Sequence, residues 1–356
     1  MPATFPTYKP RSIQEIVLQD IKEMQDDKGK IITDIVDILA EKNELLQDMR
    51  FRAANKGTDR YWTNVTTSFP KSWWMRYNRG IPASKATYAS IEETCGVLGA
   101  RSEIDARMAE EQDNGRAFRL MQDRAHIQQM SQDMTEYLFY GQKALTPEGF
   151  DGFMPRYNTL NTAEVTSKNV IDCGGTGNHL ASIWLICWGD GVFGFHPNNI
   201  PAGITVKDYG AVPMQDPDGN TIFKYLTEFR WGMGLVITDW RCVVRLCNID
   251  VDNLMSGISI GDPDVQKAGD MNLLIRLQQA VGLINGVRSS GDRLGFYMNA
   301  DVLNGLNILS ARTNSNVVRV QQSFNDYGNA NDMGSFAGIP LRRVDRLKST
   351  EDKVVA

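Results

Sequence analysis

The stretch that decides the fold is residues 72–105, which reads SWWMRYNRGIPASKATYASIEETCGVLGARSEID. It opens with a Trp-Trp pair beside basic and aromatic residues and continues in β-forming sequence, yet it holds no recognisable catalytic constellation. Aromatic residues and Arg are enriched at the cores of protein interfaces, where Lys and Glu are depleted. The stretch therefore indicates either a surface made for contact or, as the plainer interpretation, an ordinary β-rich core.

Around this stretch the apolar pattern has the period of two that is typical of β-strands. One face of the first strand carries Tyr61, Thr63, Val65, Thr67 and Phe69. Turn residues occur at Asn55-Lys56-Gly57 and at Asn78-Arg79-Gly80. The pattern predicts a long hairpin, and a hairpin must find a partner surface because two strands alone cannot bury both faces.

Helical patterns lie on both sides of the hairpin. Ser12 and Glu15 form a capping-box pattern before one helix, and a second helical pattern follows Gly29. The longest helical pattern begins at Asn114 and stops before Gly141, which suits the residue that ends a helix. About 27 residues at about 1.5 Å each give a rod of roughly 40 Å.

The second half of the chain mixes strands and helices. Residues 169–250 read mostly as strand, in which Gly232 and Gly234 predict a bulge or bend between two strand halves. An amphipathic helix ends near Gly286, and Asn299 caps a shorter one. A last strand over residues 339–347 precedes a charged tail. This order of elements predicts an α+β fold rather than repeated βαβ units.

The charge of the chain argues against a protein that coats nucleic acid. The 38 Lys and Arg residues are outnumbered by 43 Asp and Glu residues, which gives a net charge of −5. A duplex-binding protein normally shows a concentrated basic footprint. Lys71, Arg76 and Arg79 lie among aromatic residues and could bind single-stranded nucleic acid. Nothing else extends this positive stripe, so a subunit interface is favoured.

The cysteines indicate a reducing compartment. They are odd in number and lie mostly in apolar runs, which favours buried free thiols: Cys95, Cys173, Cys187, Cys242 and Cys247. None forms a CxxC pair, so a zinc site is not expected. No run approaches the roughly 18 apolar residues that cross a bilayer, and the N-terminus lacks a signal-like apolar stretch. We expect no membrane association and a protein that is cytosolic when made.

The search for chemistry gives no catalytic, cofactor or metal site, so the sequence predicts no enzyme. Gly174-Gly175-Thr176-Gly177 lacks the GK[ST] ending of a phosphate loop and favours a β-turn. The three histidines have no partners at metal-ligand spacing. Paired carboxylates are interpreted as solvated faces, because adjacent side chains point in different directions. These pairs are Asp26-Asp27, Glu92-Glu93 and Glu110-Glu111.

An ordered series of segments resembles the major capsid proteins of tailed bacteriophages, which share the HK97-like capsid fold. The series comprises residues 72–105, LFYG at 138–141, NVIDCGGTG at 169–177, SIWLICWG at 182–189 and RWGMGLVITDWRCVVRLCNID at 230–250. The resemblance implies a structural subunit of an icosahedral viral capsid that self-assembles into hexamers and pentamers enclosing dsDNA. The alternatives are the shell protein of an encapsulin-like nanocompartment and an enzyme of unrecognised class.

The resemblance also implies a division of the chain into parts. These are an N-terminal arm (1–49), an extended loop (50–85), a peripheral domain (86–168) with a spine helix (114–140), a mainly axial domain (169–320) whose long strands (224–250) return to the peripheral domain, and a C-terminal strand and tail (321–356). The two N-terminal helical patterns could instead form a helical hairpin packed on its own domain. The candidates for contacts between subunits are Tyr61, Trp62, Phe69, Trp73, Trp74, Arg76, Tyr77 and Arg79.

The partners implied by the resemblance are other copies of the chain, a portal protein and enclosed dsDNA that is not bound in a sequence-specific way. A decoration protein is left open. The helical pattern reaches the hairpin within about 50 residues and leaves no room for a built-in scaffold, so we expect a separate scaffolding protein. The expected location is the virion capsid, after assembly in the host cytoplasm.

Overall fold

The computed structural model describes residues 45–355, except 112–114, 216–218, 257–272, 290, 314–317 and 325–329. Almost all of the predicted N-terminal arm lies outside the described residues, including the first helical pattern and all but the end of the second, which falls in α2 (Leu45–Asp48). The described chain forms two compact units. Unit 1 holds residues 99–130 and 204–230, and unit 2 holds residues 45–98, 131–203 and 231–355. The division falls within β4 (Gly96–Asp105), α4 (Gly115–Tyr140) and β9 (Thr221–Ile237).

Unit 1 consists of the second part of β4, α3 (Ala106–Glu110), the first part of α4, β8 (Ile204–Gln215) and the first part of β9. Strand β9 pairs with both β4 and β8. Its small core centres on Ile104, Ala109 and Phe118, which are buried against one another. Asp105 caps α3 by accepting a hydrogen bond of 2.8 Å from the backbone N–H of Arg107.

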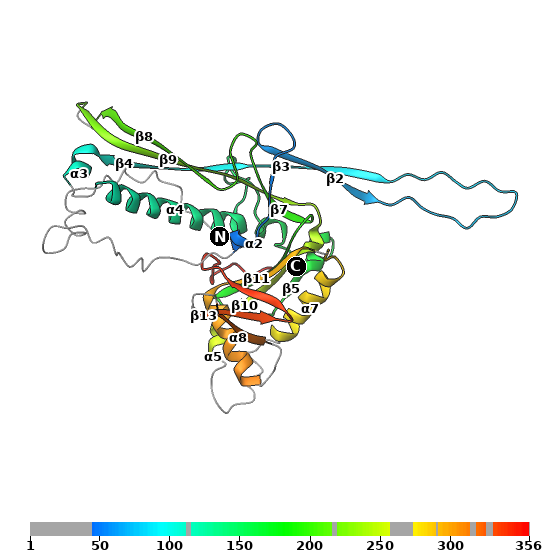
Figure 1. The fold of residues 1–356 in the computed structure, drawn as a ribbon. Coiled ribbons are helices and arrows are strands. Elements are labelled where there is room, and N and C mark those ends of the chain that lie inside the picture. The colour runs from blue at the N-terminus through cyan, green and yellow to red at the C-terminus, as the bar shows by residue number, and fades with distance from the viewer. Residues whose placement is uncertain are drawn as a thin grey trace. The chain divides into compact units, whose positions relative to one another are not determined.

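Unit 2 is built on a mixed seven-stranded sheet with the order β12-β13-β14-β11-β6-β10-β5 (Figure 1). The strands are β5 (Val170–Asp172), β6 (Leu180–Trp188), β10 (Val243–Asp250), β11 (Arg293–Met298), β12 (Val318–Phe324), β13 (Ala330–Phe336) and β14 (Ile339–Arg343). Strand β6 is antiparallel to β10 and β11, and β13 is antiparallel to β14. Strand β5 runs parallel to β10, and β14 runs parallel to β11. All nine residues of β6 are buried, which explains the continuous apolar run in the sequence.

Helices and short 3₁₀ turns complete unit 2. Besides the second part of α4, they are α2 (Leu45–Asp48), η1 (Met154–Arg156), η2 (Val165–Asn169), η3 (Trp240–Cys242), α5 (Val251–Ser256), α7 (Leu273–Asn285) and α8 (Ala300–Thr313). Helix α7 buries the apolar face that its periodicity predicts. Asn299 Oδ1 accepts a 3.0 Å hydrogen bond from the N–H of Asp301, so the predicted cap of α8 is confirmed.

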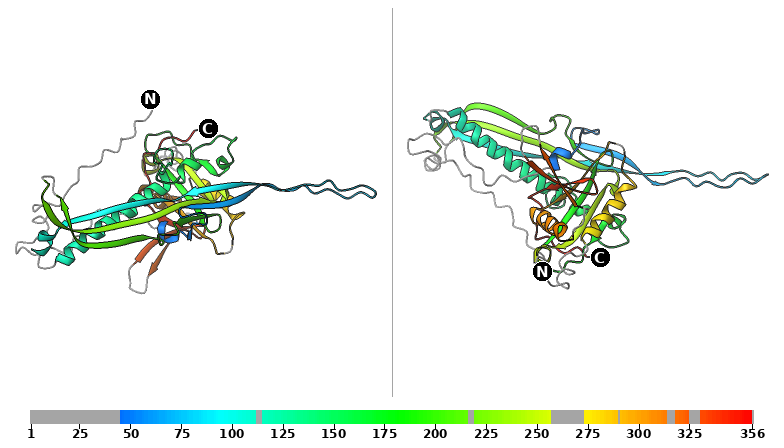
Figure 2. Two further views of the ribbon diagram at one scale, coloured as in Figure 1. Left: turned by 90° about the horizontal axis from the view of Figure 1, so that it is seen from above. Right: turned by 60° about the horizontal axis from the view of Figure 1, so that its bottom comes forward.

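Two further groups of paired strands share unit 2. Strand β1 (Phe51–Ala53) runs parallel to β7 (Val192–His196), and β7 is antiparallel to the second part of β9. Strands β2 (Arg60–Ser68) and β3 (Thr87–Thr94) form a separate antiparallel hairpin. Its strands run from residue 60 to 94, later in the chain than the extended loop predicted at 50–85. The long paired ribbon is visible in every view (Figures 1 and 2).

The sequence predicts a bulge or bend between two strand halves at Gly232 and Gly234, but the strand is not divided there, because β9 continues unbroken through both residues. The chain leaves the strand only at η3. A Cβ added at Gly234 would lie 2.4 Å from the ring of Phe195 and 2.9 Å from the carbonyl oxygen of Thr94, and one at Gly232 would lie 2.6 Å from Pro197. The two glycines therefore permit close packing of neighbouring chain segments.

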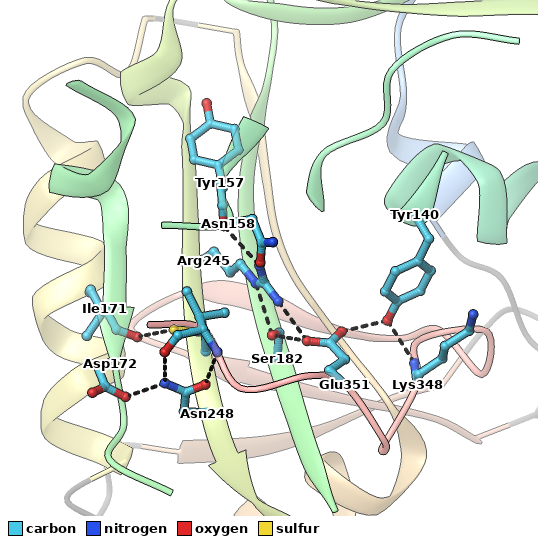
Figure 3. Close-up of polar contacts among 12 residues, drawn as sticks. Tyr140, Tyr157, Asn158, Ile171, Asp172, Ser182, Arg245, Asn248, Lys348 and Glu351 are labelled. Carbon is cyan, nitrogen blue, oxygen red and sulfur yellow. Dashed lines mark hydrogen bonds and ion pairs between the residues drawn. The ribbon is translucent and has the colours of Figure 1, made fainter. Parts of the chain in front are cut away.

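The charged C-terminal tail is anchored in the core of unit 2. Glu351 is buried, and its carboxylate lies 2.9 Å from Arg245 Nη2 (Figure 3). It also accepts hydrogen bonds from Ser182 and, at 2.6 Å, from Tyr140. Farther along, the backbone N–H of Val354 donates to Asn248 Oδ1 at 2.9 Å. The last residues thus complete the polar interior of unit 2.

Candidate subunit-interaction surface

The hairpin of β2 and β3 carries the residues that the sequence proposes as contacts between subunits. Within the described residues, each of its strands pairs only with the other, from Arg60↔Thr94 to Ser68↔Thr87. Tyr61, Thr63 and Val65 are half-buried while their neighbours are exposed, which confirms the period of two. The alternation ends where the register shifts between Thr66 and Ser68. Beyond this point both faces of the hairpin are exposed.

The base of the hairpin is held firmly by unit 2. The ring of Tyr61 packs edge-on against Phe193 and Phe195, with centroid distances of 5.1 and 5.6 Å. Asn55 donates from Nδ2 to the carbonyl oxygen of Trp62 at 2.7 Å and accepts from the N–H of Trp62 at 2.6 Å. These contacts fix the direction in which the two strands leave the unit.

Two adjacent carboxylates strengthen the same base from opposite faces. Glu93 accepts two hydrogen bonds from Arg156, at 2.6 and 2.9 Å. Glu92 faces the other way and accepts from Arg60 at 2.8 Å and Lys56 at 3.0 Å, and these hydrogen bonds, that from Arg60 first, lower the pKa of Glu92. The interpretation of this pair as a solvated face is wrong for Glu93, whose side chain is largely buried in a bidentate ion pair.

The hairpin ends in the tip, which we define as residues 69–86. The chain reverses at Tyr77 and Asn78, where the N–H of Arg79 donates to the carbonyl oxygen of Arg76 at 3.3 Å. Asn78 has a φ of 58°, a left-handed conformation that Asn adopts more readily than most residues. The turn predicted from Asn78, Arg79 and Gly80 is therefore confirmed. The tip extends beyond the paired ends of β2 and β3 (Figure 1).

The tip exposes large apolar side chains. Trp74 is 99% exposed, Phe69 83% and Met75 80%. Tyr77 is fully exposed, and Trp73 is exposed to a lesser degree. Single exposed apolar residues are common on soluble proteins, but a cluster of this size is typical of an interaction site.

The eight candidate contact residues fall into two groups. Seven have exposed positions along the hairpin: Trp62, Phe69, Trp73, Trp74, Arg76, Tyr77 and Arg79. Tyr61 instead packs inside its own chain. Sequence reasoning missed Met75, Ile81 and Tyr88, which are also exposed. Their position in the same hairpin was the available signal, since an unpaired hairpin exposes both of its faces.

The five cysteines are free thiols, four buried and Cys95 half-buried, as the sequence predicts. Burial raises the pKa of the Cys95 thiol to about 12. At pH 8 its thiolate fraction is then roughly a thousandfold lower than that of a thiol with the ordinary pKa near 9.

We expect Cys95 in the folded subunit to resist iodoacetamide at pH 8 and to react fully in urea, as measured by mass spectrometry of its peptide. Rapid labelling of the folded protein would contradict this result.

In the part of the chain that the structure describes, no three or more His, Cys, Asp or Glu side chains gather where a metal ion could bind. Nor is any of the described helices long and apolar enough to cross a membrane. The glycine cluster after Cys173 leads into strand β6, and the N–H of Gly175 donates to the carbonyl oxygen of Asn248 at 2.8 Å. It thus lacks the following helix that a phosphate loop requires.

Comparison with solved structures identifies the class of protein. A chain in a near-atomic structure of bacteriophage Epsilon15 is similar with a TM-score of 0.71 and 26% identity, over 96% of this chain and 98% of that chain. The bacteriophage JBD30 capsid matches with a TM-score of 0.47 and 12% identity, over 94% and 99%. The SrpI encapsulin of Synechococcus elongatus matches with a TM-score of 0.39 and 11% identity, over 58% and 86%. The fold is an HK97-like capsid fold, as the sequence predicts.

The family follows from the sequence itself. The model of the family described as Major capsid protein GP7 matches residues 26–355. The chain therefore belongs to this family of major capsid proteins and is a structural subunit of a bacteriophage capsid, located in the virion. No curated protein matches it.

Proposed function

We propose that this capsid protein builds a closed shell of hexamers and pentamers through the hairpin tip, which seats on a neighbouring copy. The observation that carries the proposal is the exposed cluster of Phe69, Trp74, Met75 and Tyr77 on a hairpin whose base is fixed. Covering such a surface with a neighbouring copy lowers the free energy of the system, because apolar area is removed from water. Many weak contacts of this kind, closed by symmetry, give a shell far more stable than any one pair.

The predicted parts of the chain can now be assigned to described elements. We assign the extended loop to the hairpin of residues 60–94, the spine of the peripheral domain to α4 and the axial domain mainly to the seven-stranded sheet of unit 2. The long β9 fits a strand that returns to the peripheral domain. The residues proposed to contact neighbouring subunits are Trp62, Phe69, Trp73, Trp74, Arg76, Tyr77 and Arg79.

Family membership supports further partners and a purely structural role. The shell would be assembled in the host cytoplasm with a separate scaffolding protein, would incorporate a portal protein and would enclose dsDNA without reading its sequence. A net charge of −5 suits a wall that does not trap a polyanion. A decoration protein on the outer surface is compatible with this account. We infer that the chain itself catalyses no reaction.

Electron microscopy of the expressed chain tests this function. With the scaffolding protein encoded beside it, the chain should give closed, uniform shells containing hexamers and pentamers. Expressed alone, it should give aberrant or incomplete assemblies. Uniform shells of the correct size from the chain alone would contradict the separate scaffold. A small discrete oligomer under both conditions would contradict the shell.

A further inference from the structure

Unit 2 contains a cavity of about 300 Å³ whose lining begins just after the hairpin strand β3. Its apolar lining comes from Val97 and Leu98 of β4, Met134 and Tyr137 of α4, and Phe150. Tyr137 and Phe150 meet edge-on with a centroid distance of 5.1 Å. Val97 is 53% exposed. The cavity is thus an aromatic-lined recess that is open to a ligand from outside.

The polar residues of the recess are acidic. Asp133 and Glu148 contribute to its lining, and both lie at exposed positions. Within the described residues no basic side chain contributes to this lining. An occupant should therefore combine a large apolar group with positive charge.

The tip has that combination. Trp74 presents an indole to solvent, and Arg76 and Arg79 lie beside it at exposed positions. Aromatic rings prefer edge-on or offset contact with other rings, which Tyr137 and Phe150 can offer. Arg pairs well with carboxylates and is enriched, with Trp, at the energetic centres of interfaces.

A copy cannot fill its own recess in this way. The recess begins at Gly96, next to the fixed base of the hairpin, whereas the tip begins beyond the Ser68↔Thr87 pair. Nine residues of extended strand separate Thr87 from Gly96, which corresponds to about 30 Å. The tip extends away from this base (Figure 1). The occupant must therefore come from another molecule.

We propose that the tip of one copy seats Trp74 in the recess of a second copy, with Arg76 and Arg79 facing Asp133 and Glu148. This inference rests on the proposed function and names the acceptor surface for the tip. It makes the recess, and not merely a flat face, the determinant of where the hairpin lies on its neighbour.

Site-directed cross-linking tests the pairing. Met75→Cys, which leaves Trp74 in place, and Val97→Cys are introduced together in a Cys95→Ala background, and assembled particles are oxidised mildly and run on non-reducing gels. Because a disulfide needs Cα atoms within about 7 Å, this pair should give ladders of cross-linked subunits at least about tenfold above the control. The matched control pairs Met75→Cys with Val206→Cys, an exposed position of unit 1.

Charge exchange gives a second readout that does not depend on cysteine geometry. Arg76→Glu with Arg79→Glu should reduce particle yield, and adding Glu148→Arg should restore part of it. Two results together would overturn the recess while leaving the proposed function intact. The cysteine variant would form particles without the specific cross-link, and Glu148→Arg would fail to rescue the Arg76→Glu, Arg79→Glu variant. Failure of the unaltered chain to form particles would overturn both.

Discussion

Replacing Glu351 by Ala is expected to lower the free energy of unfolding of the unassembled subunit by about 3–5 kcal/mol. Arg245 and Glu351 have side chains that are 0% and 3% exposed. Removing the carboxylate leaves a buried guanidinium without its counter-charge, and a buried charge without a partner is costly. Urea unfolding of the purified subunit, followed by tryptophan fluorescence, measures the loss.

The surroundings of this ion pair show why the cost should be large. Arg245 also donates to the carbonyl oxygen of Tyr157 at 2.9 Å and to Ser182 Oγ at 3.1 Å (Figure 3). Tyr140 donates to Glu351 and accepts from the N–H of Lys348 at 2.9 Å. Loss of Glu351 therefore disturbs a connected network and releases the C-terminal segment from α4 and β6.

A double variant separates the effect of charge from that of packing. Arg245→Met combined with Glu351→Leu should recover part of the lost stability, since replacing a buried pair by apolar residues is often neutral or favourable. Glu92→Gln, in the more exposed ion pair at the hairpin base, should have a much smaller effect than Glu351→Ala. Equal losses for Glu351→Ala and the double variant would contradict the role given to the buried charge.

Replacing Trp73 and Trp74 by Ala is expected to prevent shell formation while leaving the folded subunit intact. Both side chains are exposed in the subunit, so its free energy of unfolding should change by less than about 0.5 kcal/mol. A buried Trp at an interface contributes about 2 kcal/mol or more, which is about 30-fold in the association constant of each contact. The loss recurs at every contact in the shell, so the protein concentration needed for assembly should rise steeply.

Sedimentation velocity of the assembly reaction measures this outcome. Tyr88→Ala, which removes an exposed aromatic ring from β3 outside the tip, is the matched control and should assemble more nearly as the unaltered chain does. Shells formed at unchanged concentration by the Trp73→Ala, Trp74→Ala variant would show that the tip does not contribute the contact.

Local patterns predicted much of the fold. The apolar run of β6, the buried face of α7 and the cap at Asn299 depend on residues close together in the sequence, so periodicity and capping chemistry are sufficient to find them. Helix α4 occupies Gly115–Tyr140, where the sequence pattern predicts a helix. The hairpin was recognisable because its turn residues and its alternating strand lie within a few residues of each other.

The features that the sequence did not predict depend on distant partners. Gly234 is required by Phe195 and Thr94, and neither neighbour is visible from the local sequence. Glu351 is buried in an ion pair with Arg245, which lies 106 residues earlier in the sequence. Tyr61 and Trp62 are both large aromatic residues, yet Tyr61 packs against Phe193 of its own chain. In each case a non-local contact decided the role of a residue whose type alone suggested another.

The most direct test of the account is a cryo-electron microscopy reconstruction of the assembled particle in which the hairpin tip can be traced. Density for residues 69–86 is expected on an adjacent subunit, with the indole of Trp74 covered by residues of that neighbour. A tip that folds back on its own chain, or that stays uncovered in a closed shell, would contradict it.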